Sequence, residues 1–256
     1  MSHLTNKQAS IDNVKPEEIY SMLKEAEAAS DQPQAILLWS GGLDSTYLLW
    51  KFLERQSIEG VSYRRLKVIQ ANWTNQSGYN EFRQAREAIK KILHSKYGRS
   101  IDSLVEFVDS HDITLHSPVV GAGGLSQPML WLMLGLYCAS EKDTIIFGYI
   151  KTDCFWHVAN DFGMAAFHLQ KIMGKQDVRL SYPLEWVNKH EIIRKFKNSA
   201  PEIYNACWYC EDGSYEKNRT CNKCDSCIIH RVAELYNIED QSESDSSGVM
   251  RLEKSS

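Results

Sequence analysis

Apolar and polar residues alternate in blocks along this chain, and the period changes from block to block. Short apolar runs, typical of buried strands, are followed by stretches in which apolar residues recur every three or four positions, as in amphipathic helices. The pattern predicts strands at 34–39, 66–72, 104–108, 144–148 and 178–182, and helices at 16–29, 44–56, 79–95, 127–140, 158–173 and 188–198.

This alternation predicts an α/β fold in which a parallel sheet carries helices on both faces. Ligands of such sheets bind beyond the carboxyl ends of the strands, where the strand order reverses. We expect a nucleotide-binding domain over 34–200, preceded by an extension (1–33) that holds the lead-in helix. A small cysteine-rich segment (201–238) and a polar, disordered tail (239–256) follow.

The junction between the first strand and its helix reads Ser40-Gly41-Gly42-Leu43-Asp44-Ser45. The first helical turn leaves backbone N–H groups unpaired and carries the positive end of the helix dipole. Glycines lack a Cβ and let phosphate oxygens approach those N–H groups closely. The loop therefore predicts a phosphate or pyrophosphate site. It is not a Walker A loop, because no Gly-Lys-Ser/Thr follows.

Five of the seven cysteines fall between residues 207 and 227, and the last three form Cys-x-x-Cys-x-x-Cys. Thiolates at this spacing can wrap one ion, and Zn²⁺ prefers four such ligands in a tetrahedron. An iron–sulfur cluster is the alternative, because it also takes thiolates. The segment predicts a structural metal site, and five candidate cysteines for four positions leave one spare.

The composition limits the classes of function. With 256 residues, 43% hydrophobic and 24% charged, the chain is expected to be globular, and a net charge of −4 argues against a broad nucleic-acid surface. The longest apolar run is too short to span a bilayer, and the polar N-terminus shows no secretory signal. We expect a cytoplasmic protein without a membrane partner, whose cysteines bind metal rather than form disulfides.

The glycine loop resembles the PP-loop of the ATP pyrophosphatases, which cleave ATP between the α- and β-phosphates. Together with the closing cysteine triplet it resembles the 7-cyano-7-deazaguanine synthase (QueC) family over roughly residues 34–235. Three further segments match the family pattern: the strand end Ile145 to Gly148, the segment from Pro183-Leu184 to Lys189-His190-Glu191-Ile192, and Ala206-Cys207-Trp208.

The resemblance implies a Rossmann-like, adenine nucleotide alpha hydrolase-like fold and an ATP-dependent carbon–nitrogen ligase. Such an enzyme adenylates 7-carboxy-7-deazaguanine and converts it with ammonia to an amide and then a nitrile. ATP, Mg²⁺ and Zn²⁺ are the implied cofactors, and a homodimer is the implied assembly.

The resemblance also implies roles for individual residues. Catalysis falls to Ser40, Asp44, Ser45 and Lys189, with Asp44 helping to hold Mg²⁺. ATP is bound by these four and by Trp39, Gly41, Gly42, Leu43, Thr46 and Gly148. Zinc is bound by Cys207, Cys221, Cys224 and Cys227, with Cys210 as the alternative to Cys207. Substrate contacts fall on Gln76, Glu81, Asp153 and Trp156.

The loops expected to meet the acceptor depart from the family pattern. Residues 75–81 lack the usual Arg-His pair, and residues 151–157 read Lys-Thr-Asp-Cys-Phe-Trp-His. One alternative is a divergent paralogue that couples the activated deazapurine to a protein or nucleic acid. The others are a non-catalytic, zinc-stabilised nucleotide-binding adaptor and a tRNA-modifying PP-loop enzyme, the last disfavoured by the missing basic runs.

Overall fold

The computed structural model describes residues 33–73, 78–113, 126–210, 212–214, 217 and 219–236. Five strands form one parallel sheet in the order β5-β4-β1-β6-β7, and β2 pairs with β3 in a separate hairpin. In chain order the elements are β1 (Ala35–Leu38), α2 (Leu43–Arg55), β2 (Ser57–Ile58), β3 (Val61–Ser62), β4 (Leu66–Trp73), α3 (Tyr79–Tyr97), α4 (Ser100–Leu104), β5 (Val105–Ile113), α5 (Ser126–Cys138), β6 (Thr144–Ile146), the short 3-10 helix η3 (Cys154–His157), α6 (Ala159–Ile172), β7 (Arg179–Ser181), α7 (Lys189–Ser199), α8 (Pro201–Ala206) and a helix that begins at residue 225 and is described to residue 236.

Strand β1 lies at the centre of the sheet, and all four of its residues are buried. Ala35 pairs with Leu66 of β4 on one side and with Thr144 of β6 on the other. The chain builds β4 and β5 outward from β1 and then crosses over to build β6 and β7. The strand order therefore reverses between β1 and β6, and a ligand crevice is expected at their carboxyl ends.

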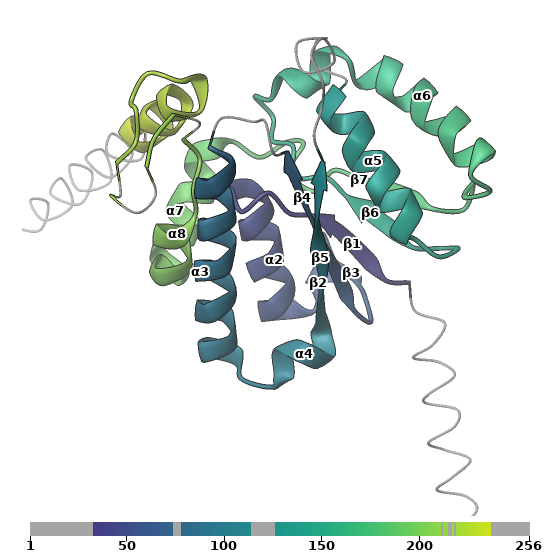
Figure 1. The fold of residues 1–256 in the computed structure, drawn as a ribbon, viewed down its shortest axis with the longest axis horizontal. Helices are drawn as coiled ribbons and strands as arrows, with labels where there is room; N and C mark the ends of the chain where they lie inside the picture. Colours follow the sequence, from purple (N-terminus) through teal and green to yellow (C-terminus); the bar gives the residue numbers. More distant parts are fainter. Residues whose placement is uncertain are drawn as a thin grey trace, which may run out of the picture.

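The sheet separates two apolar cores, and Figure 1 shows helices on both of its faces. Alternate residues of a strand point to opposite faces. Ala35 and Leu37 accordingly join the core beneath α2, α3, α7 and α8, whereas Ile36 and Leu38 join the core beneath α5 and α6. This two-sided burial explains why the first strand reads as an uninterrupted apolar run.

The predicted α/β fold is confirmed, and the differences concern local elements. The β2–β3 hairpin was not predicted, although its turn residues Glu59 and Gly60 have the positive φ values (52° and 77°) that favour tight hairpins. Short helices α4 and α8 and the helix from residue 225 are further additions. The lead-in helix at 16–29 and the tail at 239–256 lie outside the described residues. None of the described helices has the length and apolar character needed to cross a bilayer.

Candidate active site and metal centre

The glycine loop forms a compact turn between β1 and α2, at the point where the strand order reverses. Gly41 has φ +85°, a conformation that favours glycine. The Ser40 hydroxyl accepts a hydrogen bond from Gly42 N at 3.1 Å, and the Ser45 hydroxyl accepts one from Ser40 N at 3.3 Å. The two hydroxyl oxygens lie 3.2 Å apart. Ser40 and Ser45 therefore fix the shape of the loop from within.

The first turn of α2 faces the end of this loop without a side-chain cap. Gly42 is the N-cap residue, and no side-chain hydrogen bond caps the turn in the described structure. The N–H groups of Leu43, Asp44 and Ser45 belong to the turn that has no intrahelical acceptors. An anion at this position would receive those hydrogen bonds and the favourable end of the dipole.

Two residues of the predicted ATP site support the loop from below. The indole N–H of Trp39 donates to Thr46 Oγ1 at 2.9 Å, and both side chains are buried. Buried polar atoms that pair with each other avoid the cost of lost hydration. Trp39 and Thr46 therefore hold the strand–helix junction together from inside the protein.

Lys189 and Asp44 meet at the mouth of the loop, although 145 positions separate them in the sequence. Lys189 Nζ donates to both carboxylate oxygens of Asp44, at 2.8 and 2.6 Å. Lys189 is the first residue of α7, whose start is fixed by a capping box between Asn188 and Glu191. The pair places a cation and a carboxylate beside the unpaired N–H groups of α2.

Gly148 closes the other side of the crevice, directly after β6. A Cβ at this position would lie 3.3 Å from Ser45 N and 3.4 Å from Ser45 Cα. The segment that follows β6 therefore passes against the first turn of α2 with no room for a larger side chain. The structure thus brings together the loop, Lys189 and Gly148, which the family resemblance had grouped.

Asp153 lies in the turn that follows Gly148. Its Oδ2 accepts a hydrogen bond from Ile150 N at 2.7 Å. Burial raises the pKa of the Asp153 carboxyl to about 6, and the nearby Asp44 carboxylate adds to the rise, while the Ile150 hydrogen bond and Lys189 oppose it. Asp153 is therefore electrostatically coupled to the Asp44–Lys189 pair.

The other predicted substrate residues are less informative about a ligand. The Trp156 indole N–H donates to Ile150 O at 2.6 Å, so it braces the same turn. Glu81 lies in the first turn of α3 and is partly buried. Gln76 falls outside the described residues. These substrate contacts stay predictions.

Arg86 of α3 is a site residue that the sequence analysis missed. It is 2% exposed, and its Nη1 donates to Ser40 O at 2.8 Å. A Cβ on Gly41 would lie 2.7 Å from Arg86 Cγ, so the arginine stem packs directly on the loop. A buried guanidinium therefore sits behind the predicted phosphate site and supports its positive potential.

Replacing Arg86 with Met keeps the apolar stem and removes the guanidinium. We expect ATP affinity to fall about 10- to 100-fold, because a hydrogen bond to a charged group contributes roughly 1.5–3 kcal/mol. Titration calorimetry with Mg-ATP would measure the change. Lys91→Met is the matched control, since Lys91 is exposed on the same helix. Equal affinities for the Arg86→Met variant and the wild type would contradict this role.

A pH dependence follows from the raised pKa of Asp153. The contribution of the Asp153 carboxyl to the stability of the folded state is fully present below its ordinary pKa of 3.8. This contribution is lost as the pH rises through about 6, because the buried carboxyl must then ionise. We therefore expect Asp153→Asn to raise the free energy of unfolding by about 1–3 kcal/mol at pH 7.5 and to change it little at pH 4.

Urea unfolding of both proteins at the two pH values would measure this difference. Burial lowers the pKa of His230 to about 4, so protonation of this histidine destabilises the folded state at low pH. The wild type and the Asp153→Asn variant share this effect, so it cancels in the difference between their unfolding free energies. An equal Asp153→Asn effect at pH 4 and pH 7.5 would show that the carboxyl does not titrate as expected.

The cysteine segment brings four thiols together. The Sγ atoms of Cys210, Cys221, Cys224 and Cys227 all lie within 4.8 Å of one another, and Cys221 and Cys227 are 3.9 Å apart. A tetrahedral ion with metal–sulfur bonds of about 2.3 Å spaces its ligands by about 3.8 Å. The spacing therefore fits four thiolates around one ion.

Backbone N–H groups point at these sulfurs. Lys223 N and Cys224 N donate to Cys221 Sγ at 3.5 and 3.3 Å, and Cys221 N donates to Cys210 Sγ at 3.1 Å. The first two lower the pKa of the Cys221 thiol to about 6. These hydrogen bonds favour the thiolate of Cys221, the form that binds metal, whereas burial raises the pKa of the Cys210 and Cys227 thiols.

The structure places Cys210, the alternative to Cys207, with the other three cysteines, and it places Cys207 apart from them. Cys207 is the C-cap residue of α8, where its thiol donates to Ile203 O at 3.3 Å inside the main core. Cys207 is therefore a core residue next to the loop rather than part of the cysteine cluster.

The metal segment contacts the glycine loop directly. Trp208 N donates to Gly41 O at 3.3 Å, and a Cβ on Gly42 would lie 3.6 Å from Trp208 O. Trp208, Cys210 and Cys227 share a small apolar cluster with Ala85 and with Phe82 of α3. The four-cysteine cluster therefore supports one wall of the predicted ATP site.

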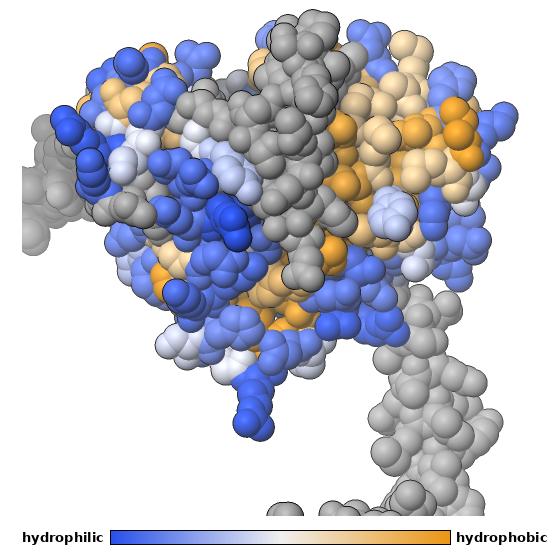
Figure 2. Space-filling model, viewed as in Figure 1, coloured by the Kyte–Doolittle hydropathy of each residue, from blue (hydrophilic) through white to orange (hydrophobic). Residues whose placement is uncertain are grey.

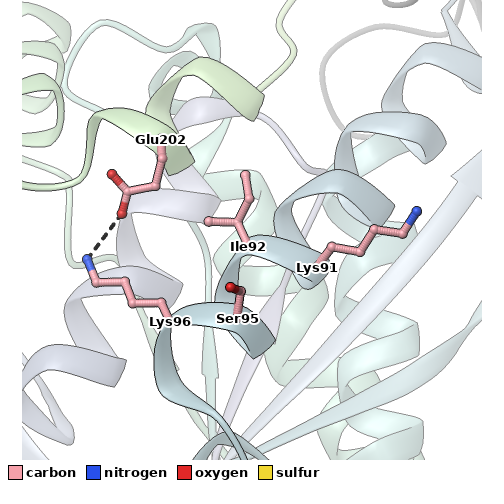
Figure 3. Close-up of a pocket in the computed structure, with 5 residues that line it drawn as sticks. All are labelled: Lys91, Ile92, Ser95, Lys96 and Glu202. Carbon is pink, nitrogen blue, oxygen red and sulfur yellow. Dashed lines mark hydrogen bonds and ion pairs between the residues drawn. The ribbon is translucent and has the colours of Figure 1, made fainter.

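A separate groove of about 480 Å³ lies between α3 and α8, lined by Lys91, Ile92, Ser95, Lys96 and Glu202 (Figure 3). Lys96 and Glu202 form an ion pair across it, at 3.3 Å. The groove is far along α3 from the glycine loop, and its charged pair is already satisfied. The Lys96–Glu202 ion pair links α3 to α8.

Residues 128–236 match the family model described as queuosine biosynthesis protein QueC. This part of the chain is similar to QueC. The matched range covers β6, Gly148, Lys189 and the four clustered cysteines, so the part of the chain that resembles QueC includes the candidate metal centre.

No curated protein sequence matches the chain. Among solved structures, the U34-tRNA thiolase NcsA from Methanococcus maripaludis, solved with its 4Fe–4S cluster, is similar at 14% identity and a TM-score of 0.40. The match covers 87% of this chain and 75% of that one. A likeness at this level assigns neither a substrate nor a cofactor to the present chain.

Proposed function

We propose that this QueC-like enzyme adenylates a 7-deazaguanine carboxylate, such as 7-carboxy-7-deazaguanine, and transfers the acyl group to ammonia. The observation that carries the proposal is the meeting of the glycine loop, Gly148 and the Asp44–Lys189 pair at the reversal of strand order. The QueC match over 128–236 supports the choice of acceptor.

In the first step a carboxylate oxygen attacks the α-phosphorus of ATP, and the bond to the β-phosphate oxygen breaks. Pyrophosphate leaves with that electron pair and gains negative charge as it does so. The N–H groups of the first turn of α2, together with Lys189, are placed to stabilise this charge. The Ser40 and Ser45 hydroxyls keep the loop in the required shape.

In the second step ammonia attacks the acyl carbon, AMP leaves with the C–O electron pair, and the nitrogen loses a proton to give the amide. A second ATP then activates the amide oxygen, and loss of AMP and a proton gives the nitrile. Mg²⁺ bound to ATP would neutralise phosphate charge, and Asp44 is the carboxylate placed to help hold it.

The four clustered cysteines fit Zn²⁺ best among the metals that thiolates bind. The Cys221 and Cys227 Sγ atoms are 3.9 Å apart and all four lie within 4.8 Å of one another, which suits one ion, whereas a multi-iron cluster holds its thiolates farther apart. We propose a structural zinc, because all four positions would be occupied by protein ligands.

The test is pyrophosphate release from ATP in the presence of the deazaguanine carboxylate and ammonium. We expect release to require the carboxylate, and ¹⁸O in that carboxylate to appear in AMP. Mass spectrometry of the organic product would distinguish amide, nitrile and a conjugate to another acceptor. Binding of ATP without pyrophosphate release, across the carboxylates tested, would overturn the ligase and favour a non-catalytic adaptor.

A further inference from the structure

His230 is a buried histidine on the helix that begins at residue 225, and one of its two ring nitrogens has no partner. The residue is 5% exposed. Its Nε2 lies 3.0 Å from the Tyr204 hydroxyl of α8, whereas its Nδ1 is buried without a hydrogen-bond partner among the described residues. Buried polar atoms are normally paired, so an unpaired one calls for an explanation, and a catalytic role is one.

The partners of Tyr204 determine which nitrogen of His230 carries the proton. Burial raises the pKa of the Glu234 carboxyl, but the hydrogen bond from Lys197 outweighs this and holds the pKa below its usual value, so Glu234 is ionised. The Tyr204 hydroxyl donates its single proton to Glu234 Oε1 at 3.2 Å. Its oxygen therefore accepts from the Nε2–H group of His230, which leaves Nδ1 with an unprotonated lone pair.

The network around His230 fixes its ring and leads to the surface. The imidazole stacks on Tyr209, with ring centroids 3.9 Å apart and an interplanar angle of 13°. At the outer end, the side chains of Lys197 and Glu234 are 45 and 38% exposed. Figure 2 shows mainly hydrophilic side chains over α3 and the cysteine-rich end of the molecule. The ring is thus held in one orientation, with its protonated nitrogen on a network that meets water.

The imidazole is coupled to the predicted ATP site. Burial lowers the pKa of His230 to about 4, and Glu234 opposes this change. Lys189 and Lys197 lower the pKa further, whereas Asp44 raises it, so both members of the Asp44–Lys189 pair act on the ring. His230 is therefore uncharged at neutral pH, and its lone pair is available near that pair. The negative phosphates of bound ATP would raise the pKa of His230 towards neutrality, where a base is most effective.

We propose that His230 Nδ1 is the base that accepts a proton from ammonia in the second step of the proposed ligase reaction, on which this inference rests. The ammonia nitrogen bonds to the acyl carbon, AMP leaves with the C–O electron pair, and the proton that the nitrogen loses goes to Nδ1. Glu234 stabilises the resulting imidazolium through Tyr204, and the imidazolium then returns its proton to water. A donor that reaches so deeply buried an atom has to be small, which favours ammonia over a larger amine.

Separate measurement of the two steps on the full-length, metal-loaded protein tests this role. Exchange of pyrophosphate into ATP that depends on 7-carboxy-7-deazaguanine, without ammonium, measures the first step, and mass spectrometry of the amide measures the second. We expect His230→Gln to keep the exchange and to form the amide about 100-fold more slowly, as for loss of a general base. The glutamine NH₂ can still donate to Tyr204, so this variant removes the basic nitrogen alone. His168→Gln, at an exposed histidine of α6, is the control and should match the wild type in both steps.

Hydroxylamine distinguishes a base from a structural residue. It is an uncharged and strong nucleophile at neutral pH, whereas ammonia is then mostly ammonium and has to lose a proton. We therefore expect His230→Gln to transfer the acyl group to hydroxylamine at nearly the wild-type rate. Tyr204→Phe keeps the imidazole and removes its link to Glu234, so it should slow amide formation less than His230→Gln does.

Normal amide formation by His230→Gln, with the exchange intact, would overturn the role of His230 and leave the ligase proposal standing. Equal losses with ammonia and with hydroxylamine, or loss of the exchange as well, would show that His230 serves the fold or the first step. A wild-type protein without carboxylate-dependent exchange would overturn the proposed ligase, and the role of His230 with it.

Discussion

Replacing Cys210 with Ser is expected to abolish stoichiometric metal binding, whereas Cys207→Ser should leave about one metal ion per chain. Cys210 shares the four-sulfur cluster, but Cys207 donates its thiol proton to Ile203 O inside the core. Structural zinc sites contribute roughly 10–16 kcal/mol of apparent binding energy in small domains, so losing one ligand should unfold the segment from residue 208 onward. Inductively coupled plasma mass spectrometry of the purified variants would measure the metal.

The same experiment identifies the ion. A colourless protein with about one zinc per chain fits the proposal. Iron in the purified protein, together with a broad visible absorption, would show that the site holds an iron–sulfur cluster and not zinc. Full metal content in Cys210→Ser together with its loss in Cys207→Ser would restore the ligand choice that the sequence first suggested.

Metal loss should also weaken ATP binding, although the cluster does not contact the predicted phosphate position. Trp208 N donates to Gly41 O, and Gly42 packs against Trp208 O. Unfolding this segment removes one support of the glycine loop. We therefore expect Cys210→Ser to bind Mg-ATP at least about tenfold more weakly than Cys207→Ser in calorimetric titrations.

The glycine loop could be predicted from the sequence because its signal is local. Apolar residues 35–38, two glycines and the start of an amphipathic helix lie within a dozen positions, and each favours the observed strand, turn or helix. The parallel sheet could be predicted for a related reason, since each strand and its helix repeat the same pattern. The β2–β3 hairpin has only two residues per strand and leaves too little pattern to detect.

The long-range partners of the loop could not be derived from spacing. Lys189 reached the site only through the family resemblance, because 145 positions separate it from Asp44. Arg86 was missed because a lone arginine in a helix is normally exposed, and its burial depends on the tertiary approach of α3 to Gly41. The choice between Cys207 and Cys210 likewise depended on where α8 ends, which the cysteine spacing does not encode.

Removing the charge of Lys189 should have the largest effect on turnover. Lys189 Nζ lies at the mouth of the loop, bound to both oxygens of Asp44, where leaving pyrophosphate would need a cation. We expect Lys189→Met to lower kcat for pyrophosphate release about 100- to 1,000-fold, as for loss of one preorganised charge-stabilising group. Lys195→Met on the exposed side of α7 is the control and should be nearly neutral.

A structural role for Lys189 would give a different pattern. If the lysine only neutralised Asp44, Lys189→Met would destabilise the protein by leaving an unpaired, partly buried carboxylate. Adding Asp44→Asn would then remove that carboxylate and restore the lost stability. We expect instead that the double variant stays at least as inactive as Lys189→Met, because the cation and the proposed Mg²⁺ ligand are then both missing. Unfolding free energies measured alongside kcat separate the two roles. Activity recovered by Asp44→Asn in the Lys189→Met background would show that the lysine serves the fold and not the departing pyrophosphate.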